Sequence, residues 1–374
     1  MTKDKINFLR LTVKTAIIIA LISLAVIPAV GNSIGKLSVY NSIIPGRARF
    51  PYSDVPQKAY NVSVYNLDAN FASHRVSAGK KADPDQEVRV FLLGDSATWG
   101  TLLKPEETLS GQLNSLGLHT VDGRPVRFFN LGYPTLSLTK DLMILDRALD
   151  YQPDLIVWLL TLESFPKDKQ LSSPLVENNI PAIAGLYRTY QLPSLREVEA
   201  IQGSSYWKST LFGQRRNLAD IYRLQLVGAM WAITGIDQYY PADYEPAARD
   251  LEGNTTFHDW EQGEQISNNL ALDVLLAGKD AAGDIPVLFI NEPILVSSGR
   301  NSDLRYNFYY PRWAYDQYRQ ILSDLAFANK LNYLDMWDII PEEEFTNTAI
   351  HTTPAGAQLT AKMIASSILD LINP

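Results

Sequence analysis

The sequence predicts an α/β protein built as a three-layer sandwich, in which helices cover both faces of a five-stranded, mostly parallel sheet. Short apolar stretches of β-forming residues alternate with longer stretches that have helical periodicity. One short stretch, residues 155–160, is apolar throughout, as expected for a central parallel strand buried on both faces. The composition, with 46% hydrophobic and 20% charged residues, is that of a globular domain.

The predicted elements follow one another in a regular order. Strands are expected at residues 88–93, 126–130, 155–160, 286–290 and 331–334. Helices are expected at residues 106–116, 138–151, 313–329 and 354–372. Strands that alternate with helices form parallel sheets, because each crossover helix returns the chain to the same end of the sheet.

One interval, residues 165–280, is too long for a simple crossover between the third and fourth strands. We expect it to be a helical cap insertion. Within it, residues 224–236 are nearly uncharged, so this piece is either a buried cap helix or a helix that dips into a membrane interface. With 13 residues it is too short to span a bilayer.

The N-terminal segment predicts the compartment of the rest of the chain. Four basic residues within the first 14 positions precede an apolar run at 15–30, which favours a cytoplasmic tip and a membrane-spanning helix within residues 1–31. A cleavable signal peptide is the alternative, because small residues around Ala29 could form a cleavage site. Both interpretations place the remainder outside the cytoplasm, as a single-pass membrane protein or a secreted one. Residues 32–86 are then a stalk and lead-in, and 87–374 the α/β domain.

Charge and cysteine content exclude several classes of function. The net charge of −8 argues against a nucleic-acid partner, which requires a basic face. The absence of cysteine removes disulfides and thiolate metal sites. No histidine and carboxylate cluster has metal-ligand spacing, and no glycine-rich loop suggests a nucleotide, so we expect neither a metal nor a cofactor.

A candidate nucleophile follows the first predicted strand, in the sequence Gly94-Asp95-Ser96. Ligands of open α/β sheets bind beyond the carboxyl ends of the strands, so Ser96 lies where a reactive hydroxyl is expected. Its backbone N–H could also face a substrate oxyanion. A serine at such a point can equally serve only as a turn or helix cap.

A candidate base precedes the last predicted helix, in the sequence His351-Thr352-Thr353-Pro354. This loop is expected at the same edge of the sheet as Ser96, and imidazole is the usual base for a serine nucleophile near neutral pH. The chain has four histidines, and the predicted locations of His74, His119 and His258 fit a base less well.

A glycine, Gly132, follows the second predicted strand in the sequence Asn-Leu-Gly-Tyr. Glycine lets the backbone approach a ligand closely, so the Gly132 N–H is a candidate second oxyanion donor.

Together, these three motifs resemble those of the SGNH/GDSL hydrolase family. The resemblance covers roughly residues 87–163 and 284–372. It implies a flavodoxin-like fold of the SGNH type, with Ser96 as nucleophile and His351 as base. It also implies an oxyanion hole made by the Ser96 N–H, the Gly132 N–H and an asparagine side chain.

The sequence departs from the family pattern at two places. The position of the expected asparagine, after the third strand, holds Glu163, whose negative charge would repel an oxyanion; Thr161 could supply a hydroxyl instead. The position three residues before the histidine, where the family has an aspartate, holds Thr348, and Asn347 is next to it. Either could orient the imidazole, but neither stabilises an imidazolium as a carboxylate does.

Three functions fit these observations. The first is an esterase that cleaves an acyl ester of an envelope component or a small molecule through an acyl-enzyme on Ser96. The second is an O-acyltransferase, or the accessory protein of a multispanning membrane acyltransferase that modifies cell-surface polymers. The third is a non-catalytic binding protein on an SGNH scaffold.

Overall fold

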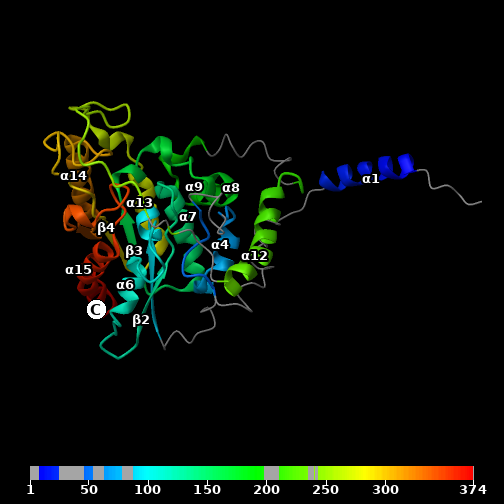
Figure 1. Ribbon diagram of the computed structural model, residues 1–374, viewed down its shortest axis with the longest axis horizontal. Coiled ribbons are helices and arrows are strands. Elements are labelled where there is room, and N and C mark those ends of the chain that lie inside the picture. Colours follow the sequence, from blue (N-terminus) through cyan, green and yellow to red (C-terminus); the bar gives the residue numbers. More distant parts are fainter. Residues whose placement is uncertain are drawn as a thin grey trace, which may run out of the picture.

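A five-stranded parallel sheet forms the centre of the molecule (Figure 1). The computed structural model describes residues 8–24, 46–53, 63–77, 87–197, 210–234, 240 and 243–373. The strands are β1 (Val88–Leu93), β2 (Val126–Asn130), β3 (Leu155–Leu160), β4 (Val287–Asn291) and β5 (Asn332–Asp335). They pair in the order β2-β1-β3-β4-β5, and every pair is parallel. The predicted five-stranded α/β sheet is confirmed.

The side chains of the central strands alternate between two hydrophobic cores. Along β1, Phe91 and Leu93 belong to the larger core, whereas Val90 and Leu92 belong to the smaller one on the opposite face. All residues of β1, β3 and β4 are buried, whereas β5 at one edge contains exposed and half-buried residues. The apolar stretch at 155–160 therefore marks a strand covered on both faces, as its composition predicts.

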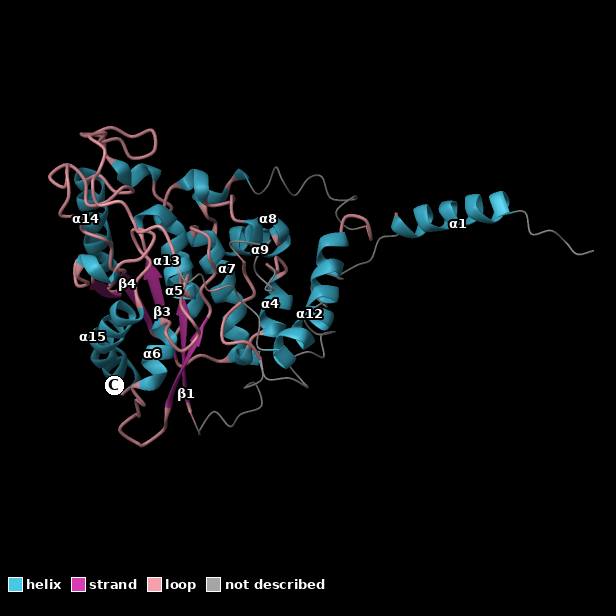
Figure 2. Ribbon diagram, viewed as in Figure 1, coloured by secondary structure: helices cyan, strands magenta, loops and turns pink. Residues whose placement is uncertain are grey.

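Helices cover the two faces of this sheet unequally. The larger core contains residues of α7 (Leu138–Ala148), α13 (Leu272–Ala282) and α14 (Arg312–Asn329). The smaller core contains residues of α6 (Leu109–Ser115) and α15 (Pro354–Ile372). Figure 2 shows these helices around the strands, which gives the three layers expected from the sequence.

Side-chain caps determine where several helices begin. Thr108, Ser137 and Thr353 each accept a hydrogen bond from a backbone N–H in the first turn of α6, α7 and α15. The helix expected at 106–116 therefore starts only after Thr108. The caps of α6 and α15 lie close to the carboxyl edge of the sheet, where the candidate site residues are found.

The segment predicted as an insertion contains several helices, including α8 (Pro174–Asn178), α9 (Ile180–Tyr190) and α12 (Arg215–Thr234). Its last helix, α13, packs into the larger core as the crossover to β4. Within the segment predicted as a stalk, α4 (Leu67–Ser73) places Phe71 in the same core. The proposed domain boundaries remain predictions.

The N-terminal segment contains α1 (Phe8–Ser23), a helix of 16 residues without a buried side chain. Among the residues that the structure describes, no helix is both long enough and apolar enough to cross a membrane. The predicted membrane-spanning helix is thus not found there. At 1.5 Å per residue, α1 measures about 24 Å, whereas the hydrocarbon layer of a bilayer is about 30 Å thick.

Candidate active site

The chain turns sharply after β1 and presents Ser96 at the carboxyl edge of the sheet. Gly94 has φ +151°, and a Cβ on it would lie 2.2 Å from Thr98 Oγ1. Asp95 then caps the one-turn helix α5 (Ser96–Trp99), because its Oδ1 accepts the Ala97 N–H at 2.8 Å. Ser96 is therefore the first residue of a helical turn held by the residue before it.

The structure brings Ser96 and His351 into hydrogen-bond contact. Ser96 Oγ lies 2.8 Å from His351 Nε2, although 255 positions separate the two residues. His351 is buried, and this burial lowers the pKa of its imidazole to about 4. The ring is therefore neutral near pH 7 and can accept the Ser96 proton.

The two residues predicted as possible partners of His351 behave differently. Asn347 Oδ1 lies 2.9 Å from His351 Nδ1, so the amide fixes the ring orientation. Thr348 Oγ1 accepts the backbone N–H of His351 at 3.1 Å and does not contact the ring. Asn347 also lines a cavity of about 390 Å³, whereas His351 does not.

The two backbone N–H groups that were predicted to bind an oxyanion differ in their hydrogen bonding. No described residue accepts a hydrogen bond from the Ser96 N–H. The Gly132 N–H, in contrast, donates to Asn130 Oδ1 at 3.0 Å, and Asn130 Nδ2 donates to the Thr98 carbonyl at 2.8 Å. In this arrangement Gly132 supports the turn that carries Ser96, and its role as an oxyanion donor stays a prediction.

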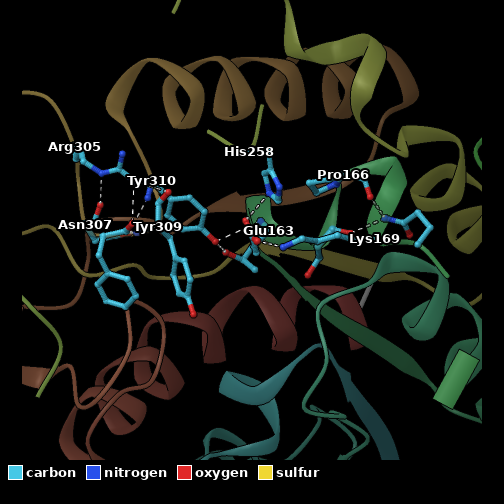
Figure 3. A network of polar contacts seen from close by, with 12 residues as sticks. Glu163, Pro166, Lys169, His258, Arg305, Asn307, Tyr309 and Tyr310 are labelled. Atoms are coloured by element: carbon cyan, nitrogen blue, oxygen red, sulfur yellow. Dashed lines mark hydrogen bonds and ion pairs between the residues drawn. The ribbon is translucent and has the colours of Figure 1, made fainter. Parts of the chain in front are cut away.

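Glu163 and Thr161 belong to a polar network beyond the end of β3 (Figure 3). Glu163 forms an ion pair with Lys169, and its second carboxylate oxygen lies 3.2 Å from His258 Nε2. Thr161 Oγ1 lies 2.8 Å from the Tyr310 hydroxyl, which also accepts the Glu163 N–H at 3.4 Å. The negative charge of Glu163 is thus compensated by Lys169. Neither Glu163 nor Thr161 forms a hydrogen bond with Ser96 among the described residues.

A buried charged cluster lies under the Ser96 turn. Lys140, which is fully buried, donates to the carbonyls of Gly94 at 2.7 Å and Tyr133 at 3.1 Å, and pairs with Asp141 at 2.5 Å. Burial raises the pKa of Asp95 to about 6, although the charge of Lys140 opposes this shift. Lys140 therefore joins the ends of β1 and β2 and places a positive charge below the nucleophile.

Comparisons with known proteins find similarity among solved structures. No family model and no curated protein matches the chain. A member of the lipolytic protein G-D-S-L family from Veillonella parvula DSM 2008 has 11% identity and a TM-score of 0.36, over 75% of this chain and 97% of that one. The native aryl esterase of M. Smegmatis has 14% identity and a TM-score of 0.34, over 76% and 99%.

The periplasmic domain of a lipopolysaccharide acetyltransferase from Salmonella ser. Paratyphi A has 10% identity and a TM-score of 0.33, over 93% of this chain and 99% of that domain. The chain is similar to SGNH/GDSL-type proteins. Because the identities and TM-scores are this low, these neighbours say nothing about the reaction of this chain, and the roles of its residues rest on the geometry of its own site.

Beyond the residues that the SGNH/GDSL pattern highlights, Tyr309 lies near the site without a signal in the sequence. Asn307 Oδ1 accepts the N–H groups of Tyr309 at 2.9 Å and Tyr310 at 3.0 Å, which fixes the loop that carries both rings. Figure 3 shows the Tyr309 hydroxyl pointing away from the network that holds Tyr310. Burial, followed by the charge of Asp95, raises the pKa of Tyr309, and no described residue accepts a hydrogen bond from its hydroxyl.

Glu292 is a second residue at this edge of the sheet that the sequence patterns do not reveal. It follows β4, is 2% exposed, and its Oε1 has no hydrogen-bond partner among the described residues. Burial, and then the charge of Asp95, raise the pKa of Glu292 well above its ordinary value. No group of three or more histidine and carboxylate side chains within the described part of the chain could hold a metal ion.

Proposed function

We propose that this chain is a serine-dependent acyl-transfer enzyme that cleaves an ester through an acyl-enzyme on Ser96. The observation that carries the proposal is the 2.8 Å contact between Ser96 Oγ and a neutral, oriented His351. A hydroxyl paired with a neutral imidazole is the activated nucleophile of acyl transfer.

In the first half-reaction, Ser96 Oγ attacks the acyl carbonyl carbon while its proton moves to His351 Nε2. The carbonyl oxygen becomes an oxyanion, and the Ser96 N–H is the described backbone donor free to face it. When this intermediate collapses, the bond to the leaving alkoxide breaks, and the imidazolium returns its proton to that oxygen. The acyl group stays on Ser96 Oγ.

In the second half-reaction, His351 takes a proton from the acceptor, whose oxygen attacks the acyl-enzyme and releases Ser96. With water as the acceptor the chain is an esterase, which is the function that we propose. With a sugar hydroxyl it is an O-acyltransferase, for which a multispanning acyltransferase could supply the donor. Envelope glycans or small esters are the proposed substrates in either case.

A non-catalytic binding function is the second candidate, because two features weaken the catalytic apparatus. Asn347 contacts His351 where a carboxylate would stabilise the imidazolium, and the Gly132 N–H is already hydrogen-bonded to Asn130. A binding protein would keep this fold without turnover.

Labelling with a fluorophosphonate probe distinguishes these functions. We expect the full chain to be labelled, and both Ser96→Ala and His351→Ala to lose labelling. Tyr309→Phe should be labelled more slowly if the phenol contacts the oxyanion, whereas Tyr333→Phe, a control distant from Ser96 on the edge strand, should react at the parent rate. A folded parent that resists the probe would contradict the catalytic proposal and favour the binding function.

We also propose that the α/β domain lies outside the cytoplasm and is tethered through its N-terminal segment. The basic residues that precede the apolar run support this orientation. A phosphatase reporter that is active only outside the cytoplasm, fused after the last residue, should be active in cells. Activity of a cytoplasm-specific reporter at the same position would contradict the proposal.

A further inference from the structure

Helix α12 exposes an apolar stripe on its outer side. Leu218, Tyr222, Leu226 and Met230 are spaced by four residues and are 36%, 68%, 55% and 43% exposed. Residues at this spacing lie on one side of an α-helix. The stripe is thus a continuous apolar surface that the described part of the molecule does not cover.

The opposite side of α12 fixes the helix in this orientation. Leu224 is buried in a small core with Val64 and Ala69. Asp220 is fully buried, and its Oδ2 accepts the N–H groups of Tyr65 and Asn66, both at 2.9 Å. Because these contacts would be lost if the helix rotated, the stripe stays on the outside.

The charge around the stripe is opposite to that of the whole chain. The chain has a net charge of −8, but α12 carries three arginines, all exposed, and its single carboxylate is the buried Asp220. Arg223 lies 3.5 Å from Asp220, whereas Arg215 lies over the ring of Phe212 and Arg216 over that of Tyr65. An exposed helix with apolar and cationic side chains fits the surface of a membrane that contains anionic lipids.

The stripe also adjoins the other uncovered apolar helix. The Phe212 N–H, just before α12, donates to the carbonyl of Ser23 at the end of α1 at 3.1 Å. Figure 1 shows α1 projecting from the side of the molecule on which α12 lies. The two uncovered helices therefore meet at one place, as expected if one apolar phase covers both.

We propose that α12 lies on the surface of a bilayer containing anionic lipids, with its apolar stripe among the acyl chains and its arginines at the headgroups. The helix then holds the α/β domain against the membrane, beyond any tether that the N-terminal segment provides. A second copy of the chain fits this surface less well. A two-fold contact would add a second set of three arginines to the same surface, where α12 has no exposed carboxylate to compensate them.

Single-cysteine labelling tests this placement, because the chain contains no cysteine. Leu226→Cys, carrying an environment-sensitive fluorophore, would report on the stripe in the full chain bound to vesicles of phosphatidylcholine and phosphatidylglycerol. Phe327→Cys is the matched control, since Phe327 is an apolar residue on α14 that is 89% exposed. We expect a blue shift, and quenching by lipid-attached quenchers, at position 226 only.

A second set of variants tests the electrostatic part. The double variant Arg216→Gln, Arg223→Gln should bind the bilayer through α12 less strongly. The equilibrium constant for placing α12 on the membrane should fall about fivefold for each arginine removed. The control Arg300→Gln, an exposed arginine outside α12, should leave it unchanged. Vesicles of phosphatidylcholine alone should shield position 226 less than the mixed vesicles do.

Three results would overturn the proposal. The first is a label at position 226 that stays as exposed to water as the label at 327 in the mixed vesicles. The second is equal shielding with and without phosphatidylglycerol. The third is shielding without vesicles that grows with protein concentration, which would show that a second copy covers the stripe. None of these results depends on Ser96, so Ser96→Ala should behave as the parent does.

Discussion

At the scale of single residues, Asn347 sets the chemical character of the site. Its amide oxygen orients the His351 ring, but it carries no charge to stabilise the ring once protonated. The pKa of His351, about 4, is therefore determined by burial alone. A base of this kind is neutral over a wide pH range but removes protons weakly, because proton-transfer efficiency falls as the pKa of the base falls.

Asn347→Asp should consequently raise both the pKa of His351 and the rate of acyl transfer. In the serine-protease triad the reverse change lowers kcat about 10⁴-fold, so we expect a gain of at least about tenfold here. The cavity beside Asn347 leaves room for hydration of the new carboxylate. The rate of fluorophosphonate labelling provides the measurement. An unchanged or lower rate in a folded variant would show that the imidazolium does not limit the reaction.

The pH dependence of labelling gives a second readout of the same pair. In the parent, reactivity should fall only as the pH approaches 4, where His351 becomes protonated. In Asn347→Asp this acid limb should move to higher pH, because a carboxylate favours the protonated ring. The stability of the parent should also fall between about pH 6.5 and 4, since the unfolded chain binds a proton there that folded His351 does not.

At the scale of elements, the close contact between the end of β2 and α5 positions Ser96. A Cβ on Gly132 would lie 2.6 Å from the backbone nitrogen of Trp99, and backbone atoms cannot move aside as a flexible side chain can. Asn130 and Lys140 reinforce the same contact through the carbonyls of Thr98 and Gly94. The nucleophile turn thus depends on packing with the neighbouring strand.

Gly132→Ala should therefore destabilise the fold by about 1–3 kcal/mol, as overpacking of a close contact generally does. It should also lower labelling of Ser96 under conditions where the variant is folded. Gly185→Ala is the matched control, because no atom lies within 4 Å of the added Cβ and alanine is favoured in the helix interior. Thermal unfolding measures both variants, and equal midpoints would contradict the packing role.

At the scale of the whole molecule, the sheet and the pairing of Ser96 with His351 follow from the sequence. Each predicted strand agrees with the structure to within one residue at either end. The carboxyl ends of parallel strands lie along one edge of a sheet, so residues 255 positions apart could be expected to meet. Local pattern and topology were sufficient for this part.

The remainder of the site depends on tertiary contacts that no local pattern reveals. Lys140 lies in the first turn of α7, where a lysine ordinarily indicates a solvated face, yet it is fully buried beneath the Ser96 turn. Glu163 was expected to repel an oxyanion, but its carboxylate forms an ion pair with Lys169 and also contacts His258. His258 comes from a loop 95 positions away, which spacing along the chain could not predict.

The weak basicity of His351 has a consequence for the kinetics of the whole cycle. An imidazole whose conjugate acid has a pKa of about 4 donates a proton to a leaving group readily but withdraws one from an incoming hydroxyl reluctantly. Turnover should therefore depend steeply on the acidity of the acceptor hydroxyl, and little on the basicity of the alcohol that departs. Because the same weak base must also remove the Ser96 proton during acylation, both half-reactions should be slow, and the isolated chain should release product linearly, without an initial burst of one equivalent.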